Sequence, residues 1–456
     1  MPSQSPARAE TPAATLAAFV ADTDFDDIPP DARETAARAI TDTVGVTLAG
    51  LGHESASIAG GVTGFDTDGF PAGGETGGSR AELALLYGTA AHALDYDDLS
   101  WAMDGHPSVV LLPPILALAD STDPSGADVV TAYAVGFEVA CALAEPISPE
   151  HYEAGWHATS TFGALGATAA AASLLDLDEG TVETALNVAA STASGVKENF
   201  GSMTKPLHAG LAARSGVTAV LLAREGFTAG ANAIDGEKGF WSLYGAGTGD
   251  DAALAAPPTT EGWTLSERGI HIKKYPACYF THSAIAAARD LAADHGVDPD
   301  EVESVRVTAA GGAGDALAYP DPDTALESKF SMQHAVAVAL TADRVSLDWF
   351  APDAVDDPSL VALRDRVTFA VDDSLHYDSH ASTVRIEADG DTYETVREHP
   401  PWTHDHPPSA DELEAKFLEA ASRTVPEDTA RETFAALRTL ADPDTDVAAL
   451  LAPLRP

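Results

Sequence analysis

The strongest constraint on the fold of this chain is a helical periodicity that runs almost without interruption through its first half. From Pro12 to about Gly226, apolar residues recur at spacings of three and four, the pattern of amphipathic helices. The pattern predicts helices over residues 32–48, 81–94, 109–119, 127–143, 159–175 and 182–194. Gly and Ala are abundant inside them, as in GALGATAAAASLL (163–175), and such small residues let helix backbones approach closely. We therefore expect a compact helical bundle.

The pattern changes after Trp263. Short segments alternate like strands at 303–309, 366–371, 382–388 and 392–396, and helical patterns cover 281–295 and 326–340. Residues 410–450 are helical again. The fold prediction is mainly α: a large all-helical domain built from both chain ends, with a smaller inserted α+β lid domain. The predicted boundaries are 1–264 for the helical domain, 265–400 for the lid, and 401–456 for the helices that return.

The charge balance excludes several classes of partner. The chain has 71 acidic residues against 25 basic ones, a formal net charge of −46. Too few bases are present to neutralise phosphates, so we expect no nucleic acid and no membrane partner. A halophilic protein, kept soluble in high salt by a carboxylate-rich surface, accounts for the acidity. A single Asp or Glu in such a chain is therefore weak evidence of chemistry.

Cysteines and apolar runs point to a cytoplasmic protein. The two cysteines, Cys141 and Cys278, are too few for a disulfide framework or a zinc cluster. The first 25 residues lack the pattern of a signal peptide. We also find no uncharged apolar run of about 20 residues, the length that crosses a membrane.

One stretch, AAHALDYDDLSWAMDGHPS (90–108), concentrates titratable side chains: His92, Asp95, Asp97, Asp98, Asp104 and His106. A helix over 81–95 would put His92 and Asp95 one turn apart on one face. Acids at the C-terminal end of a helix oppose its dipole, which hints at a functional reason for them. Taken alone, the stretch fits an acidic surface, a metal site or an acid/base site.

Two further clusters precede predicted helices. His157 stands before Thr159 and Ser160, where hydroxyls and free N–H groups can bind an anion or simply cap the helix. Lys205 stands before a helix that we expect to start at Pro206, with His208 close by. A lysine at the positive end of a helix is unfavourable unless an anion binds there, although a solvated lysine is the plain alternative.

The last cluster is the pair Lys273 and Lys274, in a chain with only seven lysines. Adjacent side chains of an extended segment point to opposite sides, so at most one of the two enters a given cleft. Together, the four clusters suit a small polycarboxylate. Lysines and helix ends would bind carboxylates while a His or Asp moves a proton.

Several separate segments, in the same order, resemble the MmgE/PrpD family over essentially the whole chain. They are HALDYDDLSWAMDGHPS (92–108), WHATSTFGALGATAAAA (156–172), MTKPLHAGLAARSG (203–216), DGEKGF (235–240), HIKKYPAC (271–278) and ESKFSMQHAVA (327–337). The family includes 2-methylcitrate dehydratases, cis-aconitate decarboxylases and an iminodisuccinate epimerase. The resemblance implies a helical domain with an α+β lid, a homodimer, and an acid/base site that needs no metal or other cofactor.

The resemblance also assigns site residues. Its catalytic positions fall on Asp95, His106, His157, Lys205 and Lys273. Substrate contacts are expected from Leu99, Thr159, Ser160, His208 and His334, with a core histidine as the plain alternative for His334. Two of these depart from the family, because Leu99 stands where relatives tend to have Thr, and His334 where they have Tyr.

The expected function is therefore a metal-free lyase acting on a small di- or tricarboxylate, most closely of the 2-methylcitrate dehydratase type. The alternatives are a cis-aconitate decarboxylase, an epimerase or isomerase of an amino- or imino-dicarboxylate, and, less favoured, a ligand-binding protein without turnover. In each enzymatic case negative charge develops beside a carboxylate, where Lys205 and Lys273 could stabilise it. The two departures leave the choice among these reactions open.

Overall fold

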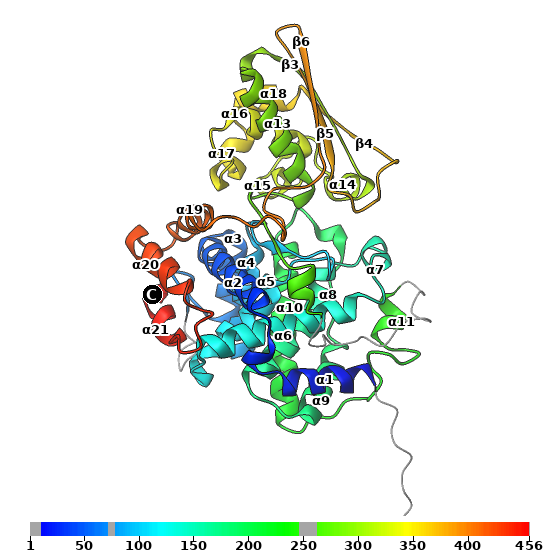
Figure 1. Cartoon of the computed structure of the whole chain (residues 1–456), viewed down its shortest axis with the longest axis vertical. Coiled ribbons are helices and arrows are strands. Elements are labelled where there is room, and N and C mark those ends of the chain that lie inside the picture. The colour runs from blue at the N-terminus through cyan, green and yellow to red at the C-terminus, as the bar shows by residue number, and fades with distance from the viewer. Residues whose placement is uncertain (1–10, 72–77, 246–261, 456) are drawn as a thin grey trace, which may run out of the picture.

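The computed structural model describes residues 11–71, 78–245 and 262–455, and these residues are mainly helical. Figure 1 shows a large group of helices below a smaller unit that contains a sheet. The helices of the lower group that precede the sheet are α1 (Pro12–Asp22), α2 (Pro30–Leu51), α3 (Glu54–Thr63), α4 (Arg80–His92), α5 (Ser108–Thr122), α6 (Gly126–Ala144), α7 (Glu150–Glu153), α8 (Ala158–Leu174), α9 (Glu179–Ala189), α10 (Thr204–Arg224), α11 (Phe240–Tyr244) and α12 (Thr264–Glu267).

Small residues allow the central helices to cross closely, as the sequence predicts. Helix α10 packs against α4 and α8, and α8 packs against α6. Where α4 crosses α10, a Cβ added to Gly88 would lie 2.8 Å from the Cα of Gly210. A side chain at Gly88 would therefore push the two helices apart.

The six predicted helices of the first half are confirmed, with ends that differ by a few residues. Helix α5 contains Pro113 and Pro114, although proline usually breaks a helix interior. The predicted end of α4 at Leu94 is wrong. The helix ends at His92, and Asp95 has a left-handed backbone with φ 50°. His92 and Asp95 are therefore not one helical turn apart.

The α+β unit contains a four-stranded sheet in the order β4-β3-β5-β6. Its strands are β3 (Val302–Ala309), β4 (Val367–Val371), β5 (Ser382–Ala388) and β6 (Asp391–Arg397). Strands β3 and β4 are parallel, and the other neighbours are antiparallel. Along β3 and β5, buried residues alternate with partly or fully exposed ones, because α13 (His282–His295) and α16 (Met332–Thr341) contact the sheet from one side.

The helix predicted over 326–340 is two helices. Helix α15 (Ala325–Ser328) ends before Lys329, and α16 starts after a break at 329–331. The break lets the ammonium group of Lys329 reach backbone carbonyls outside its own helix. Three more short helices complete the unit: α14 (Gly311–Ala316), α17 (Pro352–Val355) and α18 (Pro358–Arg364).

The chain then returns to the helical group through α19 (Ala410–Ala421), α20 (Glu427–Leu437) and α21 (Val447–Leu451). Helix α19 packs against α2, and α21 against α5. Two large hydrophobic clusters result: one joins buried residues between 13 and 272 to residues 413–454, and the other lies within 275–388. Both chain ends thus build one core, as expected, and the lid role of the second unit stays a prediction.

Among the described helices, α6 alone has the length and apolar composition of a membrane span, and 83% of its most apolar window is buried in the protein. This burial is that of a core helix.

Candidate active site

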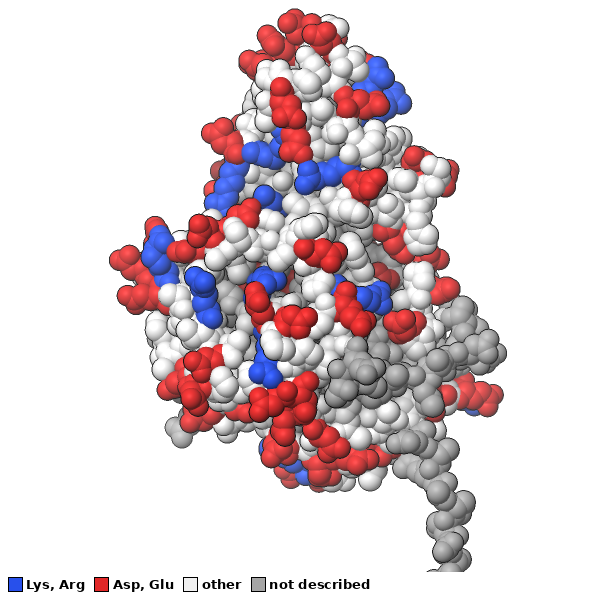
Figure 2. All heavy atoms as spheres, viewed as in Figure 1, with Lys and Arg blue, Asp and Glu red and all other residues white. Residues whose placement is uncertain are grey.

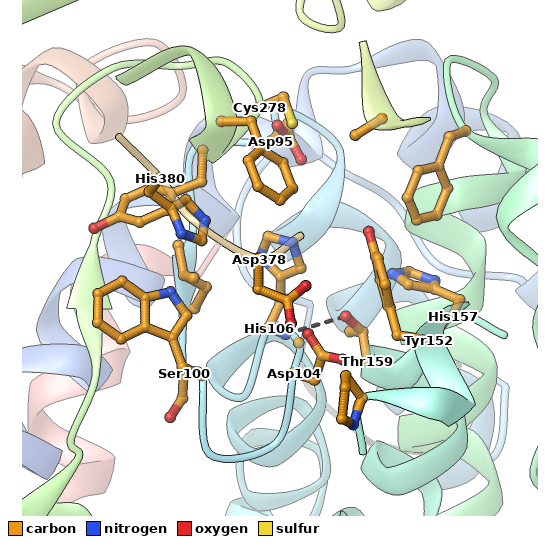
Figure 3. Close-up of a pocket in the computed structure, with 18 of the residues that line it drawn as sticks. Asp95, Ser100, Asp104, His106, Tyr152, His157, Thr159, Cys278, Asp378 and His380 are labelled. Carbon is orange, nitrogen blue, oxygen red and sulfur yellow. Dashed lines mark hydrogen bonds between the residues drawn. The ribbon is translucent and has the colours of Figure 1, made fainter. Parts of the chain in front are cut away.

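A cavity of about 450 Å³ lies where the helical group meets the α+β unit. The helical group contributes Asp95, His106 and Lys205 to its lining, and the α+β unit contributes Phe330 and His380. Figure 3 shows the side chains of Asp95, His106 and His380 among those that line this cavity. The site is thus assembled from segments far apart in the sequence.

Asp95 lies in this cavity between two lysines. Lys205 Nζ contacts its Oδ1, and Lys273 Nζ lies 3.0 Å from its Oδ2. Burial by itself would raise the pKa of Asp95, but the two ammonium groups hold that pKa well below its usual range. The same attraction outweighs burial at Lys273 and raises its pKa. Asp95 and Lys273 are therefore both charged at neutral pH.

The two lysines reach Asp95 from separate elements. Lys205 is the second residue of α10, and Lys273 follows β2 (His271–Ile272), which pairs with β1 (Asp98–Leu99). Lys273 is fully buried, whereas the side chain of Lys274 is 36% exposed and lies 3.6 Å from Glu412. The predicted opposite directions of the two lysines are confirmed.

His106 is oriented by two oxygen acceptors. Its Nδ1 lies 2.9 Å from Oδ2 of Asp97 and 2.7 Å from the carbonyl oxygen of Asp98. Because both neighbours accept, Nδ1 carries the hydrogen and Nε2 keeps a lone pair. Burial lowers the pKa of His106 below its ordinary value, so the imidazole is neutral at pH 7.

Asp97 itself is fully buried between two imidazoles. His92 Nδ1 lies 3.1 Å from its Oδ1, opposite His106. Burial opposes the charge on Asp97, but the two imidazoles hold its pKa well below the usual range.

Among the described residues, His92, Asp97 and His106 are also the group whose ligand atoms lie close enough together to hold a metal ion. Nδ1 of each imidazole is already hydrogen-bonded to Asp97.

His157 is the second imidazole of the cavity. Its Nδ1 lies 3.0 Å from Nδ1 of His208, so one ring donates to the other, and its Nε2 is buried without a hydrogen-bond partner in the described structure. Burial lowers the pKa of His157 well below its ordinary value. A neutral imidazole with a free nitrogen is available here for a ligand.

The expected substrate contacts divide into two groups. Leu99 and Thr159 line the cavity, and Thr159 Oγ1 also accepts from the backbone N–H of His106 at 3.0 Å. Ser160 and His208 lie behind the lining, where the Ser160 hydroxyl donates to the His208 carbonyl at 3.1 Å. They support His157 rather than face the cavity.

His334 requires a correction, because it does not line the cavity. It is buried in α16, and its Nε2 lies 2.9 Å from the carbonyl oxygen of Trp349. Burial lowers its pKa to about 4. Of the two possibilities for His334, a substrate contact or a core residue, the structure supports the core residue.

The lining also contains residues to which the sequence assigned no role. Cys278, Tyr152, Asp104 and Asp378 all border the cavity. Burial, and secondly the charge of Asp378, raises the pKa of Asp104 to about 7. Asp104 belongs to the acidic stretch already singled out, but Asp378 lies in a loop after β4, where no local pattern marks it.

The fold and cavity are those of a mainly helical protein in which a carboxylate, two lysines and two imidazoles line one cavity. Family profiles described as the MmgE/PrpD N-terminal domain and the MmgE/PrpD C-terminal domain match residues 14–252 and 275–442, so the chain belongs to the MmgE/PrpD family.

Curated relatives support this membership. The chain is 27% identical over 372 residues to a cis-aconitate decarboxylase of Homo sapiens, covering 79% of this chain and 76% of the relative. It is 28% identical over 385 residues to that of Mus musculus, covering 79% and 75%. A cis-aconitate decarboxylase of Aspergillus terreus is 25% identical over 332 residues, or 67% of each chain.

Proposed function

We propose that this protein is a lyase that acts on a small di- or tricarboxylate. The observation that carries the proposal is the pair Lys205 and Lys273 on the single carboxylate of Asp95, all three lining one cavity. Two ammonium groups share one carboxylate, which leaves one positive charge for a substrate carboxylate. In a buried site such a charge stabilises negative charge that develops beside that carboxylate.

His106 is the group best placed to move the proton. Nδ1 of His106 carries the ring hydrogen and donates it to Asp97 and to the Asp98 carbonyl. Nε2 is therefore unprotonated and can accept a proton from the substrate. The imidazolium that forms is stabilised by Asp97 and can return the proton later in the reaction. His157 is the second candidate, and the His157–His208 contact fits either direction of transfer.

The first candidate reaction is decarboxylation of cis-aconitate, because relatives at 27% and 28% identity are cis-aconitate decarboxylases. Loss of CO₂ breaks a carbon–carbon bond and leaves an electron pair on the substrate, which spreads towards a remaining carboxylate. The lysines would stabilise that charge, and one proton from an imidazolium would then add to carbon.

The second candidate is dehydration of 2-methylcitrate, which the neutral state of His106 favours. Dehydration starts with removal of a proton beside a carboxylate, and a neutral imidazole with a free Nε2 is ready to take it. Decarboxylation, in contrast, needs a protonated group that donates a proton to carbon after CO₂ has left. Epimerisation of an imino-dicarboxylate would use the same proton transfer in both directions.

The test is turnover of cis-aconitate, 2-methylcitrate and iminodisuccinate, followed by NMR in D₂O. Decarboxylation gives CO₂ and one deuterium in the product, dehydration gives an unsaturated acid without CO₂, and epimerisation gives inverted, deuterated substrate. We expect Asp95→Asn to lose the activity and Asp411→Asn, on the exposed start of α19, to keep it. Failure to convert any of the three would contradict the proposed lyase.

A further inference from the structure

Three consecutive backbone carbonyls of the turn that carries Asp95 each accept a hydrogen bond from a different buried lysine. Lys329 Nζ donates to the oxygen of Leu94 at 2.8 Å, and Lys273 Nζ to that of Asp95 at 3.1 Å. Lys416 Nζ donates to the oxygen of Tyr96 at 2.8 Å. Four of the chain's seven lysines thus surround this turn, counting Lys205 on the Asp95 side chain.

Lys329 joins the two halves of the site. It comes from the α+β unit, at the break between α15 and α16, and also donates to the carbonyl oxygen of Pro276 at 3.0 Å. Pro276 lies three residues after Lys273. One ammonium group therefore ties the turn that carries Asp95 to the segment that carries Lys273.

The environment of Lys329 is unusual for a lysine. The residue is 4% exposed, and within the described structure no carboxylate forms an ion pair with it. Burial lowers its pKa to about 7, although the charge of Asp95 acts in the opposite direction. Burying an ammonium group is costly unless its donors are used, and here they are used on the backbone of the site.

Lys416 reaches the turn from another part of the chain. It lies in α19, which returns from the C-terminal part of the chain, and is 1% exposed. Its Nζ also lies 2.8 Å from Asp42 of α2. The buried pair fixes Lys416 against the helical core, so the carbonyl of Tyr96 is held by a rigid group.

The lysines matter for the direction of Asp95 rather than for backbone strain. Asp95 has a left-handed φ of 50°, which Asp adopts more readily than most residues with a Cβ. The carboxylate must also lie within reach of Lys205 and Lys273 at once. The carbonyls of Leu94, Asp95 and Tyr96 each accept a charge-assisted hydrogen bond from a lysine. These bonds fix the backbone of the turn and therefore the direction of the Asp95 side chain.

We propose that Lys329 and Lys416 are positioning residues, which hold the 94–96 turn so that Asp95 and Lys273 keep their spacing in the cavity. The inference rests on the proposed function for its catalytic consequence, but its structural part can be measured without a substrate. Neither residue lines the cavity, so both act through Asp95 and Lys273 rather than by touching substrate.

The first experiment compares Lys329→Met with Lys274→Met by hydrogen exchange of the intact protein without ligand. Methionine keeps the length of the lysine side chain and removes its donors. We expect faster exchange confined to residues 92–99 and 271–278 in Lys329→Met, and no change there in Lys274→Met, whose side chain is partly exposed and outside the lining. Unchanged exchange in these segments, or faster exchange throughout the α+β unit, would overturn the proposal.

The second experiment measures kcat and KM with whichever carboxylate the wild type converts. Displacement of a catalytic group by about 1 Å can cost about 10²-fold in rate, so we expect kcat of Lys329→Met to fall by about that factor. KM should change by less than about threefold, because Lys205 and the rest of the lining stay in place. An unchanged kcat, or a rise in KM as large as the fall in kcat, would overturn a positioning role.

Lys416 needs a paired design, because removing it alone leaves Asp42 buried and unpaired. The double variant Lys416→Met with Asp42→Asn removes both charges and is compared with Asp42→Asn alone. We expect faster exchange at 92–99 and a lower kcat in the double variant than in Asp42→Asn alone, because only the double variant lacks the donor to the Tyr96 carbonyl. Equal behaviour of the two would overturn the role of Lys416. A wild type without turnover would refute the proposed function, while the exchange data would still decide the positioning role.

Discussion

Asp95 is the residue on which the proposed chemistry depends, and its charge is set by its neighbours. A buried carboxylate alone would tend to take up a proton, but Lys205 and Lys273 keep it ionised. The direction of each side chain therefore matters as much as its identity. The adjacent lysines 273 and 274 provide a matched pair with which to test this.

We predict that Lys273→Met lowers kcat by about 10²–10³-fold, the usual effect of removing one group that stabilises developing charge. Lys274→Met should leave kcat within about twofold, because its side chain lies outside the cavity lining. Steady-state kinetics of both purified variants provide the measurement. Equal losses, or a larger loss at Lys274, would mean that the wrong lysine has been assigned to the site.

The histidines predict an unusual pH dependence. Burial holds the pKa values of His106 and His157 below the ordinary imidazole value, so both stay neutral as the pH falls through 6.5. If His106 is the base, the acid limb of kcat/KM should have an apparent pKa below 6.5. A rate profile over pH 4.5–8 tests this, and an acid limb with an apparent pKa of 6.5 or above would contradict it.

The cluster of His92, Asp97 and His106 yields a prediction about metals. Both Nδ1 atoms already donate to Asp97, and a bound cation would require them to give up those hydrogens. We predict that activity survives dialysis against EDTA, with metal content checked by mass spectrometry. Loss of activity that one divalent metal restores would show that this cluster is a metal centre.

At the scale of elements, the short β1–β2 ladder connects the acidic stretch to the lysine segment. Asp98 of β1 is fully buried, its Oδ1 accepts from the backbone N–H of Ser108 at 3.2 Å, and the Ser108 hydroxyl contacts Oδ2. Burial raises the pKa of Asp98 to about 8, despite the hydrogen bonds from Ser108. Asp98 is therefore a protonated, structural residue at neutral pH.

This state of Asp98 predicts how stability changes with pH. In the folded protein Asp98 keeps its proton up to about pH 8, whereas in the unfolded chain it releases that proton near pH 3.8. The free energy of unfolding therefore falls as the pH rises from about 3.8 to about 8. The slope for one proton is at most about 1.4 kcal/mol per pH unit. Asp98→Asn, which mimics the protonated acid, should gain free energy of unfolding relative to wild type between pH 5 and 7.5.

Urea unfolding at several pH values measures this difference. Asp411→Asn, at an exposed position of α19, serves as the control whose difference from wild type should not change with pH. A constant difference for Asp98→Asn would contradict a protonated Asp98.

At the scale of the whole molecule, the dominant feature is the net charge of −46. Figure 2 shows carboxylates scattered over the visible face, with fewer bases between them. Such a surface repels itself at low ionic strength. Salt shortens the screening length from about 10 Å at 0.1 M to about 3 Å at 1 M, which relieves the repulsion.

We therefore predict that Tm rises steeply with KCl between 0.1 and 1 M and more slowly above. Thermal unfolding in KCl, compared with sucrose at equal osmolality, separates charge screening from a general osmolyte effect. A Tm that responds to sucrose but not to KCl would argue against this electrostatic account and against the proposed adaptation to high salt.

The sequence by itself determined the mainly helical class, the strands of the α+β unit and the return of the last helices, because these depend on local periodicity. It also placed Lys273 and Lys274 on opposite sides, since alternation in an extended segment is a local property. The carboxylate, imidazoles and lysines of the cavity lining came from motifs that carry the family resemblance.

Only the tertiary structure decided which side chains meet. The left-handed Asp95, the break at 329–331, the burial of His334 and the three lysines on the 94–96 carbonyls involve residues up to 320 positions apart in the chain. Local patterns cannot encode such contacts, because the ion pairs and carbonyl interactions that fix these conformations form only when the two hydrophobic units and the returning α19 enclose the turn.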